Sequence, residues 1–345
     1  MEKAEINILI TGGSGFLGRT IVNELLEPSL GIKVRNIRIL DIRIFPEELP
    51  EKASIIEGDV RNYESVREAC KGMDVVIHSA AIVDWGTKSE KEVYDVNYTG
   101  TKNVIRACRE NKIGMLVYTS SLDTVIHGKP LRNINEKQPY PEKHLNMYCK
   151  SKYLAEKLII ETNSPGLRTV ALRPSDIYGE NDPYHIMPLI NMAKGGFYLR
   201  IGNGKAKCQH VYVGNIAYAH VQAVKALVEN NGVICGKAYF ITDGEGTNFF
   251  TFFDRIVTAA GYRIWPRNLW LPKGIAYAMG IISEFFALLV RPIKYYNPKM
   301  SRFAVMYTCT DFTFSAERAR ADFNFSPKYT EQEAFDRTVE SFRNK

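Results

Sequence analysis

The sequence lacks the features that mark secreted, disordered and nucleic-acid-binding proteins. Its six cysteines form no CxxC pair, and the chain leads almost directly into an apolar run, so we expect no signal peptide and a reducing, cytoplasmic compartment. The 25 glycines and 15 prolines are scattered, which argues against low complexity. A net charge of +7 is mild; it suits anionic ligands or an anionic lipid surface and gives no reason to expect nucleic acid.

Short strand-like runs alternate with amphipathic helical segments over the first half of the 345 residues. The predicted strands are Ile6–Thr11, Arg35–Asp41, Ala53–Asp59, Asp74–Ala80, Gly114–Ser120 and Thr169–Pro174, and the predicted helices are Phe16–Glu27, Asn62–Lys71, Glu90–Asn111 and His144–Thr162. This alternation predicts an α/β protein with a Rossmann-type, doubly wound parallel sheet. We expect a dinucleotide-binding domain over residues 1–174 and a smaller, mainly substrate-binding region over residues 175–345.

A glycine-rich turn follows the first predicted strand. Gly12, Gly15 and Gly18 lie at the junction of strand and helix, and Phe16 and Leu17 begin the helix. Glycine lets the backbone turn tightly and approach a pyrophosphate, while the helix N-terminus offers unpaired N–H groups. The pattern predicts a dinucleotide site that includes these five residues.

The ends of later strands supply further cofactor-binding candidates. Asp41 ends the second strand, where a carboxylate can bind both ribose hydroxyls and would repel the extra phosphate of NADP. We therefore expect NAD in preference to NADP, although Arg43 could soften this preference. Asp59 could meet the adenine amino group, and small side chains would let the cofactor pass close to the backbone. The remaining candidates are Val60, Ser79, Ala80, Ala81 and Pro174.

A tyrosine and a lysine lie four residues apart on the fourth predicted helix. This spacing places Tyr148 and Lys152 on one face, so both could also contact the cofactor. A neighbouring ammonium would stabilise a phenolate and lower the pKa of Tyr148, which favours proton exchange with an alcohol or carbonyl oxygen. Ser121 closes the fifth strand at the edge where ligands bind, and its hydroxyl could hold the substrate oxygen; Ser120 is the alternative register.

These residues resemble the Ser, Tyr and Lys of the extended short-chain dehydrogenases. Within that group the chain is most similar to the 3β-hydroxysteroid dehydrogenase family, which includes the sterol-4α-carboxylate 3-dehydrogenases. The matching stretches span almost the whole chain: TGGSGFLG at Thr11, VNYTGTKNVIRAC at Val96, VYTSS at Val117, ALRPSDIYGENDP at Ala171, IGNGK at Ile201, VYVGNIAYAH at Val211, GKAYFITDGE at Gly236 and RTVESFRN at Arg337. The segment LDTVIHG after Ser121 departs from the usual continuation of this family.

The resemblance implies an NAD-dependent oxidoreductase that oxidises the 3β-hydroxyl of a sterol-like lipid, with Tyr148 as general acid and base, Ser121 orienting the oxygen and Lys152 holding the nicotinamide ribose. It implies no metal. Three alternatives stay open: a ketoreductase for long-chain β-keto acids or other hydrophobic ketones, a nucleotide-sugar epimerase or dehydratase, and a non-catalytic NAD-binding redox sensor. Asp84, Trp85, Tyr184 and His185 could line the substrate cleft or belong to loops without a binding role.

One apolar segment lies near the C-terminus. Residues 274–290 are apolar except for Ser283 and Glu284, and Arg291, Lys294, Lys299 and Arg302 follow. The segment fits either an interfacial helix at a membrane surface or a buried helix of the substrate region, and less well a spanning helix. The expected partners are a hydrophobic, sterol-like small molecule, a membrane surface that the enzyme contacts peripherally, and a second copy of the chain in a homodimer.

Overall fold

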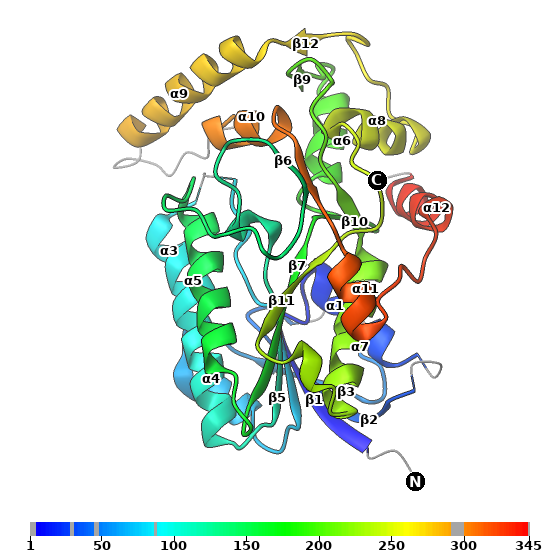
Figure 1. Ribbon diagram of the computed structural model, residues 1–345. Helices are drawn as coiled ribbons and strands as arrows, with labels where there is room; N and C mark the ends of the chain where they lie inside the picture. The colour runs from blue at the N-terminus through cyan, green and yellow to red at the C-terminus, as the bar shows by residue number, and fades with distance from the viewer. Residues whose placement is uncertain (1–4, 28–30, 45–47, 86–87, 291–299, 344–345) are drawn as a thin grey trace.

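A parallel sheet forms the centre of the molecule (Figure 1). The computed structural model describes residues 5–27, 31–44, 48–85, 88–290 and 300–343. Within them the strands run in the order β11-β7-β5-β4-β1-β2-β3. Their bounds are β1 (Glu5–Thr11), β2 (Lys33–Asp41), β3 (Ala53–Glu57), β4 (Val75–His78), β5 (Met115–Thr119), β7 (Arg168–Pro174) and β11 (Lys237–Ile241). This topology confirms the predicted Rossmann-type fold.

Helices cover both faces of this sheet. On one face lie α1 (Phe16–Leu25), α7 (Val213–Val228) and α11 (Glu317–Phe323); on the other lie α2 (Tyr63–Ala69), α4 (Gly100–Glu110) and α5 (Met147–Thr162). The short helix α3 (Glu90–Tyr94) continues through a π-helical turn, Asp95–Thr99, into α4. The predicted helix over Glu90–Asn111 is therefore helical but interrupted. Both layers bury the branched side chains of the strands between them, as a doubly wound fold requires.

The second half of the chain builds the region above the carboxyl ends of the strands (Figure 1). It contains α6 (Ile186–Lys194), α8 (Phe249–Ala259), α9 (Lys273–Val290), α10 (Arg302–Thr308) and α12 (Glu331–Phe342), with the short strands β8 (Asp176–Tyr178), β9 (Arg200–Ile201), β10 (His210–Tyr212), β12 (Trp270–Leu271) and β13 (Phe312–Phe314). The strand β6 (Leu131–Ile134) joins it by pairing with β13. Because β11 pairs with β7, the chain returns to the central sheet after residue 174. The boundary after residue 174 stays a prediction.

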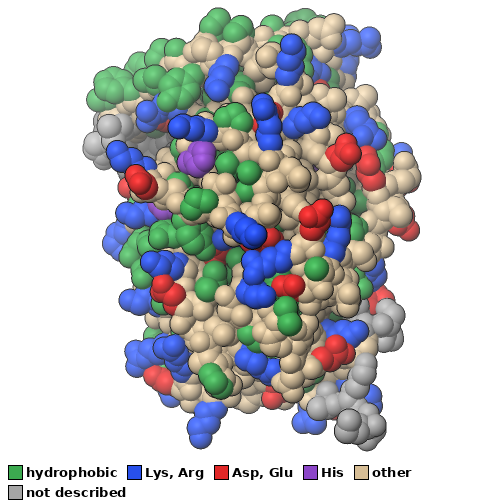
Figure 2. Space-filling model, viewed as in Figure 1, with side chains coloured by type: hydrophobic (Ala, Val, Ile, Leu, Met, Phe, Trp, Pro, Cys, Tyr) green, Lys and Arg blue, Asp and Glu red, His purple; other side chains and the backbone are tan. Residues whose placement is uncertain are grey.

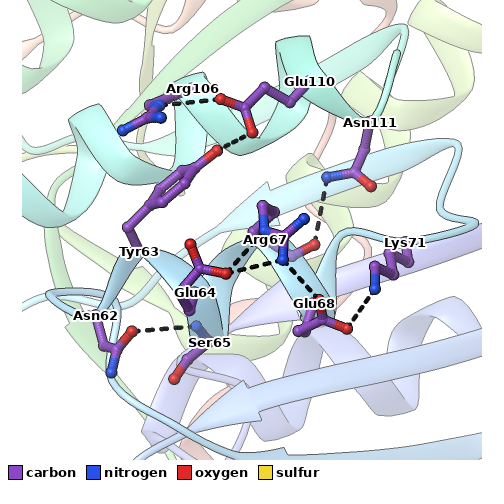
Figure 3. A network of polar contacts seen from close by, with 10 residues as sticks. All are labelled: Asn62, Tyr63, Glu64, Ser65, Arg67, Glu68, Lys71, Arg106, Glu110 and Asn111. Atoms are coloured by element: carbon purple, nitrogen blue, oxygen red, sulfur yellow. Dashed lines mark hydrogen bonds and ion pairs between the residues drawn. The ribbon is translucent and has the colours of Figure 1, made fainter.

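Polar contacts tie α2 to α4 on the outer surface (Figure 3). The Tyr63 hydroxyl donates to Glu110, which also pairs with Arg106, and the Asn111 amide donates to the carbonyl oxygen of Arg67 at 3.3 Å. The side chains of Arg106 and Glu110 are exposed, whereas Tyr63 and Asn111 are half-buried, and exposed ion pairs of this kind add little stability. The network joins two neighbouring helices on the outer surface.

The turn between β1 and α1 depends on close backbone contact. At Gly18, in the first turn of α1, a Cβ atom would lie 2.1 Å from the carbonyl oxygen of Gly12. Gly12 itself has φ +73°, a conformation that favours glycine, and the edge of β4 packs against it at Ala80. Only glycine at position 18 lets the helix pack this close to the strand end.

We expect Gly18→Ala to lower the free energy of unfolding by at least about 2 kcal/mol, because the added methyl group meets backbone that cannot move aside. Urea denaturation measures the change. Gly114→Ala is the matched control, since a Cβ at Gly114 meets no heavy atom within 4 Å. Equal stability of the two variants would contradict this account of the turn.

Candidate active site

One cavity of about 430 Å³ opens above the carboxyl ends of the central strands. Every cofactor-binding and catalytic residue predicted from the sequence lines it: Gly12, Gly15, Phe16, Leu17, Gly18, Asp41, Asp59, Val60, Ser79, Ala80, Ala81, Ser121, Tyr148, Lys152 and Pro174. Asp84, Trp85, Tyr184 and His185 line it as well. The fold therefore brings together residues from the carboxyl ends of six strands, from α1 and from α5 in one connected space.

The turn into α1 forms a cradle that fits a pyrophosphate. Gly15 caps α1 without a side-chain hydrogen bond, so the first N–H groups of the helix have no capping side chain. The hydroxyl of Ser14 is buried without a hydrogen-bond partner. A Cβ at Gly12 would lie 2.7 Å from Cα of Ala80, so any side chain there would fill the floor of the turn. Unpaired donors beside a glycine floor suit the anionic group of a dinucleotide.

Asp41 closes one side of this cradle. Its carboxylate accepts hydrogen bonds from the backbone N–H groups of Ser14, at 3.0 Å, and of Arg43, at 3.1 Å. These two bonds hold the side chain at the end of β2, beside the glycine turn. The remaining lone pairs of its oxygens can accept from two ribose hydroxyls. Arg43 lines the same part of the cavity and is exposed.

Asp59 and Ser79, which follow β3 and β4, are held in place by different contacts. Asp59 is paired with Arg61 at 2.6 Å; burial works to raise the pKa of Asp59, but the hydrogen bonds from Arg61 outweigh it and the pKa lies below its ordinary value. The Ser79 hydroxyl donates to the carbonyl oxygen of Thr11 at 2.9 Å, which joins β4 to β1. The Arg61 contact was not predicted, and it leaves Asp59 less free to accept from an adenine.

Ser121, Tyr148 and Lys152 all line the cavity. The side chain of Ser121 lies near enough to Tyr148 to work against the rise of its pKa, which favours Ser121 over Ser120 as the serine of the site. Lys152 is buried; its ammonium donates to the carbonyl oxygen of Thr119 and lies 4.5 Å from the centre of the Tyr118 ring. Burial lowers the pKa of Lys152 to about 7, although Glu156 and Asp123 oppose this shift.

The expected lowering of the tyrosine pKa is wrong for the protein by itself. Burial raises the pKa of Tyr148 well above its ordinary value, the charge of Asp123 raises it further, and the hydrogen bond with Ser121 only partly offsets them. Sequence spacing showed that Lys152 shares the helix face but not that both groups are desolvated. Burial disfavours the phenolate and the ammonium alike, so this structure keeps the phenol protonated.

A buried ion pair fixes the helix that carries Tyr148 and Lys152. Glu156, one turn after Lys152, accepts from Nε of Arg173 at 2.8 Å and from the Tyr140 hydroxyl at 2.7 Å. Both charged side chains are almost fully buried. Since Arg173 belongs to β7, the pair joins α5 to the central sheet one turn after Lys152. The sequence held a signal for it, because Glu156 continues the four-residue spacing of Tyr148 and Lys152.

Two acidic residues that the sequence reasoning missed also line the cavity. Asp123 lies two residues after Ser121 and accepts a hydrogen bond from the Ser121 hydroxyl at 2.6 Å, and Asp176 accepts one from the Tyr307 hydroxyl at 2.5 Å. Burial raises the pKa of Asp123 to about 6, and the hydrogen bond from Ser121 only partly offsets it. Asp123 lies in LDTVIHG, the stretch that departs from the family pattern, so that departure was the available signal.

Aromatic side chains form the wall away from the glycine turn. Trp85 packs edge-on against His185 and Tyr307, with ring centres 5.7 and 5.4 Å apart, and Phe303 lies 6.0 Å from it. His185 is paired with Asp182 at 3.2 Å. This wall gives the cavity an apolar part suited to a hydrophobic substrate.

The helix α9 presents an apolar face to solvent beside this wall, and Figure 2 shows hydrophobic side chains gathered at that end of the molecule. Nine large apolar side chains of the helix are exposed: Ile275, Tyr277, Met279, Ile281, Ile282, Phe285, Phe286, Leu289 and Val290. Ala276 and Gly280 are buried, and Glu284 pairs with Arg302 of α10. The alternative of a buried helix is therefore wrong, because most large apolar side chains of α9 are exposed, and the helix meets α10 at Gly280 and Glu284.

Within the described residues no helix has the length and hydropathy needed to cross a bilayer. The basic residues Arg291, Lys294 and Lys299, which the sequence places after the helix, lie outside the described residues.

Comparison with known proteins places the chain among dehydrogenases. The model of the 3-beta hydroxysteroid dehydrogenase/isomerase family matches residues 9–271. Human 3 beta-hydroxysteroid dehydrogenase type 7 is 34% identical over 359 residues, covering 98% of this chain and 96% of that protein. Mouse sterol-4-alpha-carboxylate 3-dehydrogenase, decarboxylating, is 32% identical over 338 residues, covering 97% and 90%.

Solved structures with the same fold include epimerases. An epimerase of Methanothermobacter thermautotrophicus superposes with a TM-score of 0.76 at 17% identity, covering 98% of this chain and 92% of that one. The UDP-glucose 4-epimerase of Thermus thermophilus, in complex with NAD, superposes with a TM-score of 0.72 at 23% identity, covering 98% and 99%. At such identities the likeness shows the fold alone.

Proposed function

Because the chain belongs to the 3-beta hydroxysteroid dehydrogenase/isomerase family, we propose that it oxidises the 3β-hydroxyl of a steroid or sterol with NAD. The observation that carries this proposal is that Ser121, Tyr148 and Lys152 line one cavity together with the glycine cradle and the aromatic wall. A nicotinamide dinucleotide, when bound, accepts the hydride that leaves the substrate carbon.

Each residue has a distinct task in this proposal. Ser121 holds the reacting oxygen next to the Tyr148 hydroxyl, and Tyr148 exchanges the proton of that oxygen. The protonated phenol of this structure is the form that donates in the reductive direction. For oxidation the phenol must first lose its proton, and Lys152, one turn away, is the cation that stabilises the phenolate. The aromatic wall around Trp85 packs on the ring system and excludes water.

The alternatives are less well supported. The relatives that are more than 30% identical are dehydrogenases by name, whereas the epimerases share the fold at 17–23% identity. A ketoreductase for hydrophobic ketones would use the same three residues in the reverse direction. A redox sensor would have no use for a buried tyrosine and lysine joined to a catalytic serine.

Tyr148→Phe should reduce turnover of a 3β-hydroxysterol about 100-fold to 10,000-fold while NAD still binds, because only the proton-exchanging hydroxyl is lost. Steady-state NADH formation and calorimetric NAD binding measure the two effects. Tyr153→Phe, on the same helix and outside the cavity lining, is the control and should retain activity. Turnover of Tyr148→Phe within tenfold of the parent would show that another group exchanges the proton.

NAD in preference to NADP is the finer part of this proposal. The fold and family imply a nicotinamide dinucleotide, and the position of Asp41 supports NAD. The extra phosphate of NADP would replace a ribose hydroxyl beside this carboxylate, which costs hydrogen bonds and adds repulsion between like charges.

We expect at least a tenfold preference for NAD in kcat/KM, and we expect Asp41→Ser to reduce it. Parallel assays with NAD and NADP at saturating sterol measure the ratio. Glu57→Ser is the control, because Glu57 pairs in register with Asp41 on β3 but lies outside the cavity lining. A preference of the parent for NADP would show that Arg43 governs the pocket instead.

We also propose that the enzyme is cytoplasmic and binds peripherally to an anionic membrane surface through α9. The exposed apolar side chains of α9 are too many to be left in water without a partner, and a sterol substrate resides in lipid. The net charge of +7 favours anionic headgroups, and Lys273 lies at the start of the helix. A homodimer stays a prediction that analytical ultracentrifugation can check.

Phe285, Phe286 and Leu289, each more than half exposed, are the residues to test. Replacing all three by serine should reduce liposome cosedimentation at least tenfold while NAD binding persists, and the parent should bind anionic liposomes more tightly than neutral ones. In the control variant, serine replaces Phe197 and Val233, which are exposed outside α9, and liposome binding should persist. A parent that never sediments with lipid would rule out the membrane surface.

A further inference from the structure

The ammonium group of Lys152 lies in a space with almost no water. The side chain is 2% exposed, and burial is the strongest influence on the pKa of Lys152, which it lowers to about 7. An ammonium ion has three N–H donors, and among the described residues the hydrogen-bond acceptor that meets them is the carbonyl oxygen of Thr119. Since the proposed oxidation needs Lys152 as a cation, other groups must replace the water that it has lost.

Carboxylates around Lys152 compensate its charge in part. Glu156, on the same helix, and Asp123, in the turn after β5, both favour the cation. Each of them also serves another partner, because Glu156 is paired with Arg173 and Asp123 accepts the Ser121 hydroxyl. The pKa of Lys152 therefore stays below its ordinary value despite both carboxylates.

The other titratable groups around the ammonium are neutral. His78 of β4 and His220 of α7 both feel the charge of Lys152, and burial lowers the pKa of His78 to about 3 and that of His220 to about 4. Tyr148, one turn before Lys152, stays protonated because burial raises its pKa well above the ordinary value. None of these three groups changes its charge in the pH range in which Lys152 titrates.

An aromatic ring also faces the ammonium. Nζ of Lys152 lies over the ring of Tyr118, 4.5 Å from its centre, which is within the range in which the electron-rich face of an aromatic ring attracts a cation. Tyr118 directly precedes Thr119, so β5 supplies both the ring and the carbonyl oxygen that contact the ammonium. The ring is 1% exposed and packs 5.5 Å from the His78 ring of the neighbouring strand, which keeps it in place.

We propose that Tyr118 is a positioning residue of this site, whose ring face replaces water around the ammonium and keeps Lys152 a cation on the helix face that carries Tyr148. The proposal rests on the task of Lys152 in the proposed oxidation, which is to stabilise the Tyr148 phenolate. In a desolvated space the attraction between ring and cation is stronger than at the surface, because no water competes for the ammonium. Lys152 therefore keeps its proton to a higher pH than it would beside an aliphatic side chain.

The experiment measures the protonation of Lys152 directly, by NMR of protein that is labelled at the lysine Cε; the spectrum of Lys152→Met identifies the resonance. Tyr118→Leu removes the aromatic face and keeps an apolar side chain, so the titration midpoint of Lys152 should fall by about one pH unit. Tyr118→Phe keeps the ring and should leave the midpoint within a few tenths of a unit of the parent. Tyr239→Leu, a buried position of the same sheet outside the cavity lining, is the control and should leave the midpoint unchanged.

A graded series separates the aromatic face from the shape of the side chain. Starting from Tyr118→Phe, ring fluorines are added one at a time, which keeps the shape and weakens the attraction of the ring face for a cation. The midpoint of Lys152 should fall stepwise with each fluorine. A merely structural role predicts otherwise, because water admitted by a smaller side chain would raise the midpoint and an unchanged shape would leave the series flat. This series carries the test if Tyr118→Leu folds poorly.

Sterol oxidation reports the consequence for the reaction. Above the midpoint, one pH unit corresponds to tenfold less cation, so kcat of Tyr118→Leu should fall about tenfold while Tyr118→Phe retains activity. A midpoint that Tyr118→Leu leaves unchanged or raises, or one that does not respond to fluorination, overturns the inference whatever the sterol assay shows. A parent that binds NAD and oxidises no sterol overturns the proposed function instead, and the titration of Lys152 still decides whether the ring holds the cation.

Discussion

The buried ion pair between Glu156 and Arg173 is the contact on which the geometry of the site depends. It joins α5 to β7 almost without solvent, and the Tyr140 hydroxyl completes the coordination of the carboxylate. Tyr148 and Lys152 precede Glu156 by two turns and one turn on the same helix face. Removing one partner of such a pair leaves an uncompensated buried charge, which typically costs about 3–5 kcal/mol. The pair therefore sets the height and rotation of α5 against the sheet.

A second constraint acts at the other end of the cavity. The glycine turn brings β1, α1 and the end of β4 so close together that no side chain fits at Gly12 or Gly18. The two constraints position the glycine cradle and the candidate catalytic residues, all of which line one cavity. A dinucleotide bound in this cavity would extend from Asp41, whose carboxylate would bind its ribose, to Lys152. Rigid elements on both sides are what a hydride transfer needs, because its rate depends on the position of two reacting groups.

The region over the carboxyl ends of the strands gives the site its chemical character. Its aromatic wall, formed around Trp85, Phe303 and Tyr307, gives the cavity an apolar part beside the buried carboxylates of Asp123 and Asp176. Nearby, α9 exposes the apolar face through which we propose contact with lipid. The wall proposed to contact the sterol and the helix proposed to contact the membrane thus lie in the same part of the molecule.

The sequence by itself determined the Rossmann-type sheet, the glycine turn, the place of Asp41 at a strand end and the place of Tyr148 and Lys152 on one helix, because these depend on local periodicity and short spacing. It also marked residues 274–290 as one apolar helix. Only the tertiary structure decided that this helix is exposed, that β11 returns to the central sheet, that Arg61 forms an ion pair with Asp59, and that Tyr148 has a raised pKa. It alone revealed Asp123 and Asp176 in the cavity. Burial, exposure and the pairing of charges depend on neighbours that are distant in the chain, so a local pattern of residues does not predict them.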